Sequence, residues 1–136
     1  MTTAAIWYLL KTNAAVLAVV PATRIVCGDL PLSTTLPAIS VKQISSVPVN
    51  LINTNEANRQ HTDRVQVTAL YKGTTGGYPS IKALMRLILA ACPSQRGTVN
   101  GVALTFIQPE SEGPDLYDQE LDIYSQSRDF LIRWTA

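Results

Sequence analysis

The sequence has little charge, little cysteine and only one histidine, and each shortage argues against a class of protein. Asp, Glu, Lys and Arg make up 15% of the residues, against about 25% in ordinary soluble domains. The net charge of +1 is not the polycation that usually marks a nucleic-acid-binding protein. Two cysteines make no disulfide framework, and one histidine cannot anchor an imidazole-based metal site.

The low charge also bears on how the chain meets solvent. A subunit that buries much of its surface against neighbours needs fewer solvated groups than a monomer does. The composition therefore favours an oligomer or a subunit of a larger assembly, with a compact monomer rich in surface Ser, Thr, Asn and Gln as the alternative. The length of 136 residues predicts a single domain over residues 1–136.

An apolar N-terminal run, Ala4–Val20, has the composition of a membrane span or a signal peptide but not the pattern of either. Lys11–Asn13 interrupts the run in its middle, and no basic residue precedes it. A membrane span needs about 20 apolar residues, and a signal peptide carries its positive charge at the front. We therefore expect a cytoplasmic helix that begins at Thr2 or Thr3 and ends before Pro21.

Periodicity in the rest of the chain predicts one more helix and several strands. An apolar stripe of helical spacing runs from Pro79 to Cys92, whereas Arg24–Pro37 is rich in turn residues. Apolar and polar side chains alternate, as in half-buried strands, in residues 38–44, 64–71, 99–108 and 121–134. The predicted fold class is α+β, in the order helix-strand-strand-helix-strand-strand. We expect an antiparallel sheet of about four strands with two helices packed on one face.

A polar segment, residues 50–63, separates the first two predicted strands. It contains four asparagines and few apolar side chains, so it cannot pack a core of its own. We expect either a long polar hairpin arm or a mobile loop.

No arrangement of residues in the chain is typical of an enzyme. His61 lies in the polar segment, and no serine sits in a Gly-x-Ser-x-Gly elbow. Cys27 and Cys92 are expected to be small buried apolar side chains. The glycines of 73–77 lack the spacing and the lysine of a phosphate-binding loop, although an anion at the N-terminus of the following helix remains an alternative.

Acidic residues gather near the C-terminus, where six of the ten fall between Glu110 and Asp122 with no Lys or Arg among them. We expect an acidic hairpin loop at residues 109–120. The stretch lacks the central glycine of a calcium loop. A solvated loop is the simplest interpretation, and a metal site, a protein contact or a DNA-repelling surface are the alternatives. The residues concerned are Glu110, Glu112, Asp115, Asp118 and Glu120.

The C-terminal third resembles a known family. A Tyr117-Asp118 pair precedes the last predicted strand, which closes with an Arg-x-Phe-x-Ile-x-Trp pattern at residues 128–134. This ending is similar to that of the tail-completion or tail-terminator proteins of long-tailed bacteriophages. Arg24-Ile25, the Pro37-initiated strand and the strand at 65–71 agree with the family in order. The long polar segment and Gln126, which breaks the apolar face of the last strand, depart from it.

The resemblance implies a structural role. Such proteins form rings, typically hexamers, at the head-proximal end of the tail tube, where they stop tube growth and meet the head connector. The implied partners are other copies of the chain, the tail tube protein and the connector or stopper protein, with DNA passing through the ring without specific binding. The resemblance implies no cofactor, metal or active site. It implies a virion location at the head–tail junction after synthesis in the bacterial cytoplasm.

Candidate subunit surfaces are exposed strand edges and the polar segment, which could pair with a neighbour by strand addition. For contacts with a neighbouring subunit or partner we expect a set in and after the polar segment: Asn53, Asn55, Arg59, His61, Arg64 and Tyr78. The acidic loop would either line the channel or dock on a basic partner. The alternatives are a head-closure or connector adaptor of the same neck, a small enzyme or ligand-binding domain, and a nucleic-acid module. The apolar sheet faces disfavour an enzyme, and the lack of a basic stripe disfavours nucleic-acid binding.

Overall fold

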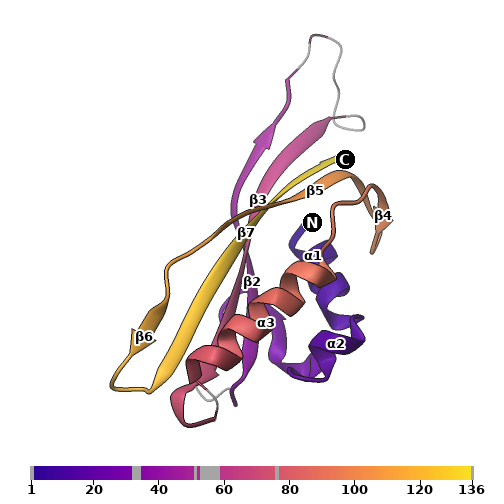
Figure 1. Ribbon diagram of the computed structural model, residues 1–136. Coiled ribbons are helices and arrows are strands. Elements are labelled where there is room, and N and C mark those ends of the chain that lie inside the picture. The colour runs from indigo at the N-terminus through magenta and orange to yellow at the C-terminus, as the bar shows by residue number, and fades with distance from the viewer. Residues whose placement is uncertain (1, 32–34, 51, 53–58, 76, 136) are drawn as a thin grey trace.

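A computed structural model describes residues 2–31, 35–50, 52, 59–75 and 77–135 (Figure 1). Three α-helices are present in this part: α1 (Thr2–Lys11), α2 (Ala14–Leu17) and α3 (Gly77–Ala91). The strands are β1 (Ile25–Cys27), β2 (Ala38–Pro48), β3 (Gln60–Lys72), β4 (Gly97–Val99), β5 (Val102–Glu112), β6 (Leu116–Asp118) and β7 (Ile123–Thr135). No helix within these ranges is both long enough and apolar enough to cross a membrane.

The strands form one curled sheet in the order β1-β2-β3-β7-β5-β4, and β6 pairs with β7 beside this path. β1 runs parallel to β2, while the other pairs are antiparallel. The predicted four-stranded antiparallel sheet with two helices is therefore wrong, since the described residues form a mixed sheet of seven strands and three α-helices. The three missed strands have only three residues each, too few to show a period of two. Register shifts in β2 and β5 interrupt the ladder, and such bulges bend a strand.

The single N-terminal helix expected from the apolar run is two helices. α1 ends at Lys11, and Asn13 caps α2 by accepting a hydrogen bond on its side-chain oxygen from the Val16 amide at 3.1 Å. Asparagine competes with helical hydrogen bonding and favours caps. Both helices still bury apolar side chains, since Leu10 and Val16 are fully inaccessible to solvent.

The helices cover one face of the sheet (Figure 1). Alternate residues of β3, such as Val65 and Val67, point into this core with Phe130 and Ile132 of β7. α3 adds Ile81, Leu84, Met85 and Ile88 to the same cluster. Among the described residues no helix covers the opposite face (Figure 1), whose side chains in β3 and β7 are mostly half-buried.

β2 extends past its neighbour β1 to form what we call the arm, residues 42–48. β1 pairs only with Ile39–Val41, whereas β2 continues to pair with β3 as far as Pro48 opposite His61. The arm is exposed throughout its length. Residues 60–63 of the polar segment belong to β3 rather than to a loop, and residues 51 and 53–58 lie outside the described part of the chain.

The acidic segment contains more strand than expected. β5 continues to Glu112, and β6 occupies 116–118. We call residues 116–122, which comprise β6 and its turn into β7, the tip. The arm and the tip lie at opposite ends of the molecule (Figure 1).

Candidate assembly surfaces

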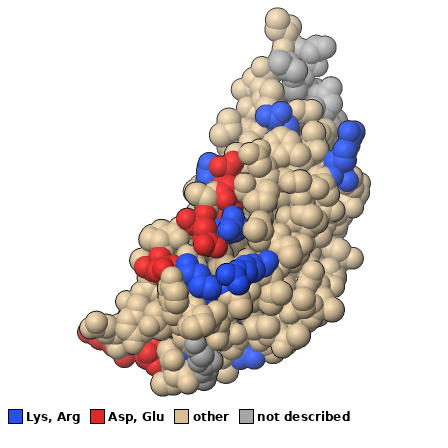
Figure 2. Space-filling model, viewed as in Figure 1, with Lys and Arg blue, Asp and Glu red and all other residues tan. Residues whose placement is uncertain are grey.

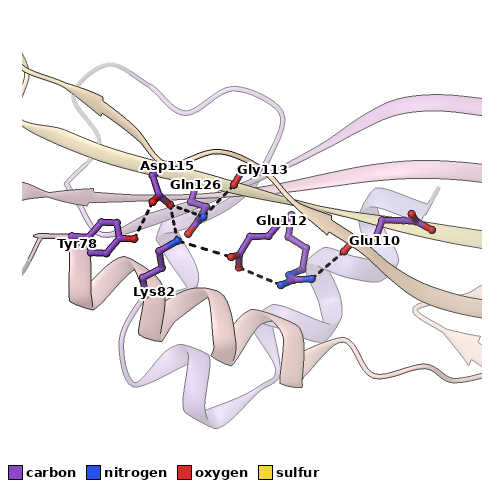
Figure 3. Close-up of polar contacts among 8 residues, drawn as sticks. Tyr78, Lys82, Glu110, Glu112, Gly113, Asp115 and Gln126 are labelled. Atoms are coloured by element: carbon purple, nitrogen blue, oxygen red, sulfur yellow. Dashed lines mark hydrogen bonds and ion pairs between the residues drawn. The ribbon is translucent and has the colours of Figure 1, made fainter.

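A polar cluster holds the segment between β5 and β6 against α3 and β7 (Figure 3). The Asp115 carboxylate accepts hydrogen bonds from Tyr78 Oη at 2.9 Å, Lys82 Nζ at 2.6 Å and Gln126 Nε2 at 2.8 Å. Gln126 Nε2 also donates to the Gly113 carbonyl at 3.2 Å. Gln126 thus breaks the apolar face of β7 because its buried amide group anchors this segment.

The cluster continues to Arg128 and Glu112. Arg128 Nη2 lies 3.2 Å from Glu112 Oε1, and its Nη1 donates to the Glu110 carbonyl at 3.1 Å. Lys82 Nζ lies 4.0 Å from the same glutamate. Acidic and basic side chains therefore alternate across this part of the surface (Figure 2), and two members of the acidic set, Glu112 and Asp115, are paired within the chain.

The Lys82–Asp115 pair shifts the pKa values of its two members in opposite directions. The hydrogen bond from Lys82 lowers the pKa of Asp115, with help from the Tyr78 hydroxyl. The hydrogen bond to Asp115 in turn raises the pKa of Lys82. Both groups are solvent-accessible, so we regard the cluster as a positioning device and not as a major source of stability.

The tip carries Asp118, Glu120 and Asp122 together with exposed apolar side chains, whereas Glu110 lies in β5. Asp118 Oδ1 accepts hydrogen bonds from the amides of Glu120 and Leu121 at 3.0 and 3.2 Å. Tyr117 Oη donates to Asp122 Oδ1 at 2.7 Å, and this bond raises the pKa of the tyrosine. Within the described ranges no three His, Cys, Asp or Glu residues lie close enough together to hold a metal ion.

His61 lies in β3 and stacks on Trp134 of β7, with ring centroids 4.6 Å apart and planes 17° from parallel. Two other predicted contact residues also have partners within the chain. Arg64 Nη1 lies 3.1 Å from Asp129 Oδ2, and Tyr78 donates to Asp115. Arg59 is half-buried, and Asn53 and Asn55 lie outside the described residues. A role in subunit contact stays a prediction for all six.

A buried carboxylate that the sequence analysis missed lies at the base of the arm. Asp63 is 1% exposed and accepts hydrogen bonds from Thr2 Oγ1 at 2.5 Å, Ser46 Oγ at 2.5 Å and Trp134 Nε1 at 2.9 Å. It therefore joins α1, β2, β3 and β7. The alternation in β3 contained the signal, because Asp63 lies two residues before Val65 and hence on the buried face.

The Arg-x-Phe-x-Ile-x-Trp pattern has a structural explanation in these contacts. All four residues project from the same face of β7. Arg128 binds β5, Phe130 and Ile132 are fully buried in the core, and Trp134 donates to Asp63. The pattern therefore secures the last strand to the rest of the sheet.

The face of the sheet that lacks helices is polar and internally paired. Thr68 Oγ1 and Ser127 Oγ lie 2.9 Å apart, and Gln66 Nε2 donates to Asp129 Oδ1 at 3.3 Å beside the Arg64 ion pair. Cross-strand pairs of this kind stabilise neighbouring strands.

Comparisons with known proteins agree with these features. Residues 4–134 match the family described as tail completion protein gp17. The fold is similar to a chain from the virion of a native gene transfer agent particle, with a TM-score of 0.71 and 13% identity over 98% of this chain and 94% of that one. A second solved structure gives a TM-score of 0.55 and 15% identity over 99% and 94% of the two chains. No curated protein matches the chain in sequence. The chain belongs to the tail completion protein gp17 family of structural phage tail proteins, and it is a virion component.

Proposed function

We propose that the chain forms a closed ring, a hexamer by analogy with similar proteins, at the head-proximal end of a phage tail. The ring ends growth of the tail tube and presents its other side to the head connector. DNA passes through it without specific binding, and no catalytic step is involved. The observation that carries this proposal is the family match over residues 4–134.

The surface of the chain is consistent with such an assembly. A ring is closed by contacts between two different surfaces of each subunit. The arm and the tip are two different surfaces at opposite ends of the molecule (Figure 1). The low charged fraction of 15% also suits a chain that buries much of its surface against neighbours.

The ion pairs of the acidic segment favour contact with a partner over lining the DNA channel. Glu112 and Asp115 are neutralised by Arg128 and Lys82, so they contribute little to a negative potential along a channel. The tip acids Asp118 and Glu120 remain for contact with a partner.

The first test is the solution mass of the purified protein by light scattering, with negative-stain images of the same sample. A ring of about six copies with a central hole supports the proposal, because closed cyclic assemblies give a fixed mass. The protein is then added to tails from a phage that lacks it, and tail lengths are compared with and without addition. A monomer that also fails to bind tail tubes contradicts the proposal. Binding to filled heads but not to tubes indicates a head-closure adaptor instead.

A further inference from the structure

The described part of the chain exposes eight large apolar side chains, and six of them lie at the two ends of the molecule, near the arm and on the tip. They are between 45% and 108% exposed. On and just beyond the arm they are Ile44, Val47 and Ile52, and on the tip they are Leu116, Tyr117 and Leu121. Scattered single apolar side chains are normal on a surface, but groups of them mark contact sites.

The tip presents a cleft. It has a volume of about 740 Å³, and its apolar walls come from Leu70, Leu116, Tyr117, Leu121 and Ile123. Asp118 and Glu120 also line it and make it acidic. The cleft is held in shape by the contact of Tyr117 with Tyr124, whose ring centroids are 4.4 Å apart, and by the hydrogen bond from Tyr117 to Asp122. A preformed cleft loses little entropy on binding.

The arm presents a strand edge. Within the described ranges, no strand pairs with the outer side of residues 42–48. Ile44 lies at a register shift between Gln43 and Ser45, and Val47 follows in the regular ladder. Such an unpaired edge with exposed apolar side chains is open to association. Within the arm, Ser46 is held by its hydrogen bond to Asp63.

We propose that, within the ring proposed above, the arm of one copy places Ile44 and Val47 in the tip cleft of the next copy. The proposal thus rests on the proposed function and names the surface that closes the ring. The occupant of the cleft is a second copy of this chain, and each copy gives its arm to one neighbour and receives an arm from the other.

Charge and position favour the arm-to-tip contact over a contact between two tips or between two arms. Residues 113–127 carry four acidic side chains and no Lys or Arg, so two tips facing each other would repel. Residues 40–50 carry one charge, Lys42, and two arms facing each other would leave both clefts empty. The arm-to-tip contact joins opposite ends of the molecule, as a head-to-tail ring requires.

Thiol cross-linking tests the pairing. In a Cys27→Ser background, where Cys92 remains fully buried, the double variant Val47→Cys, Leu121→Cys is oxidised both in solution and on tails. A disulfide needs Cβ atoms about 4 Å apart, so a short thiol–thiol linker is used in parallel. A head-to-tail contact gives a ladder of covalent multimers up to the ring number, while neither single variant gives covalent multimers. The control pair Tyr8→Cys, Leu121→Cys uses an exposed position on α1 and gives no ladder.

A second measurement separates contact from folding. Val47→Asp places a carboxylate beside the acidic side chains of the cleft, and Val47→Lys places a cation there. Because Val47 is exposed in the free chain, both variants fold. We expect Val47→Asp to weaken subunit association by about tenfold or more, and Val47→Lys to weaken it less.

The outcomes distinguish this proposal from the ring itself. Rings of normal mass without a ladder, a ladder equal to that of the control pair, or covalent dimers from Leu121→Cys alone overturn the arm-to-tip contact and leave the ring intact. A chain that forms no ring and binds no tail overturns both.

Discussion

Asp63 offers a sharp test of what holds the arm to the body of the protein. Its carboxylate accepts three side-chain hydrogen bonds, two on Oδ2 from Thr2 and Trp134 and one on Oδ1 from Ser46. In Asp63→Leu these three donors lose their acceptor, and an apolar side chain of roughly similar size takes the place of the carboxylate. In Asp63→Asn the amide oxygen can take the place of Oδ2, and the amide nitrogen can donate to the Ser46 hydroxyl. The two substitutions therefore separate loss of charge from loss of hydrogen bonding.

The magnitude follows from the contacts. Hydrogen bonds to a charged group contribute about 1.5–3 kcal/mol each, so three of them amount to roughly 4.5–9 kcal/mol. Removing the ionised carboxylate from a site that is 1% exposed also removes a desolvation cost of several kcal/mol. We expect a net loss of about 3 kcal/mol for Asp63→Leu and about 1 kcal/mol or less for Asp63→Asn. A domain of this size is stable by about 5–15 kcal/mol, so the first variant still folds.

Urea unfolding followed by tryptophan fluorescence measures the free energies of unfolding, and hydrogen exchange locates the effect. We expect the amides of the arm and of its partner residues in β3 to exchange faster in Asp63→Leu than in Asp63→Asn. The matched control is Asp129→Leu, which removes a half-buried carboxylate from the face without helices. The reasoning is refuted if Asp63→Leu is as stable as the unmodified protein. It is also refuted if Asp63→Asn lowers the free energy of unfolding as much as Asp63→Leu does.

Three further predictions concern the core, the polar cluster and the thiols. Phe130→Ala empties a fully buried site and should lower the free energy of unfolding by about 3–5 kcal/mol, as urea titration would measure; a loss below 1 kcal/mol contradicts the packing. The Asp115 carboxyl should titrate by NMR below its ordinary pKa of 3.8, and Lys82→Met should move it back up. Because folding lowers the pKa of Asp115, the pair with Lys82 stabilises the folded state at pH values above the pKa that Asp115 has in the unfolded chain. This stabilisation is lost as the pH falls through the pKa of Asp115 in the folded protein. An unchanged titration of Asp115 in Lys82→Met contradicts the pairing. Cys27 is exposed, so the expectation of two buried cysteines was wrong for it, whereas burial raises the pKa of Cys92 to about 12. A thiol reagent at pH 8 should therefore modify Cys27 in the folded protein and Cys92 only in urea; fast reaction of both contradicts the burial of Cys92.

The long elements could be predicted from the sequence because their periodicity extends over many residues. The alternation in 64–71 predicted β3, and the apolar stripe after Pro79 predicted α3. Both extend past the predicted limits, to Gln60 and Gly77. The composition of the polar segment hid the first residues of β3, since His61 and Asp63 are not typical strand residues. They form strand because β2 and β7 pair with them on both sides.

The short elements could not be predicted in the same way. β1 lies in a turn-rich stretch and is a strand because its three residues pair with Ile39–Val41. The break between α1 and α2 falls at the polar residues Lys11–Asn13, and the cap that Asn13 provides is visible only when its partner amide is known. These features are set by tertiary contacts, which override local propensity.

The candidate site could not be fully predicted for the same reason, because its contacts join residues that are distant in the sequence. The sequence grouped five acidic residues as one loop, because they are neighbours along the chain. Their partners come from other elements, Lys82 from α3 and Arg128 from β7. These partners separate the paired Glu112 and Asp115 from Asp118 and Glu120 on the tip, and Glu110 in β5 belongs to neither group. The apolar members of the tip were not singled out, since Leu116 and Leu121 stand apart from any periodic run.

The arm and the tip differ in chemistry, because the arm is an apolar strand edge and the tip is an acidic cleft. This difference determines how a ring built from arm-to-tip contacts would stop growing. A contact between two like surfaces closes after two copies, whereas a contact between unlike surfaces continues until rotation brings the last arm to the first tip. The rotation between copies is then set by the angle at which the arm leaves the body. Pairing with β3 directs the arm, and we expect Asp63 to hold it further, because Asp63 ties Ser46 of the arm to Thr2 and Trp134. If the arm closes the ring, Asp63→Leu should broaden the distribution of ring masses even where Val47 and Leu121 are unchanged, and mass photometry of the variant against Asp63→Asn would show it. A single sharp mass in both variants would mean that the arm angle does not set the ring number.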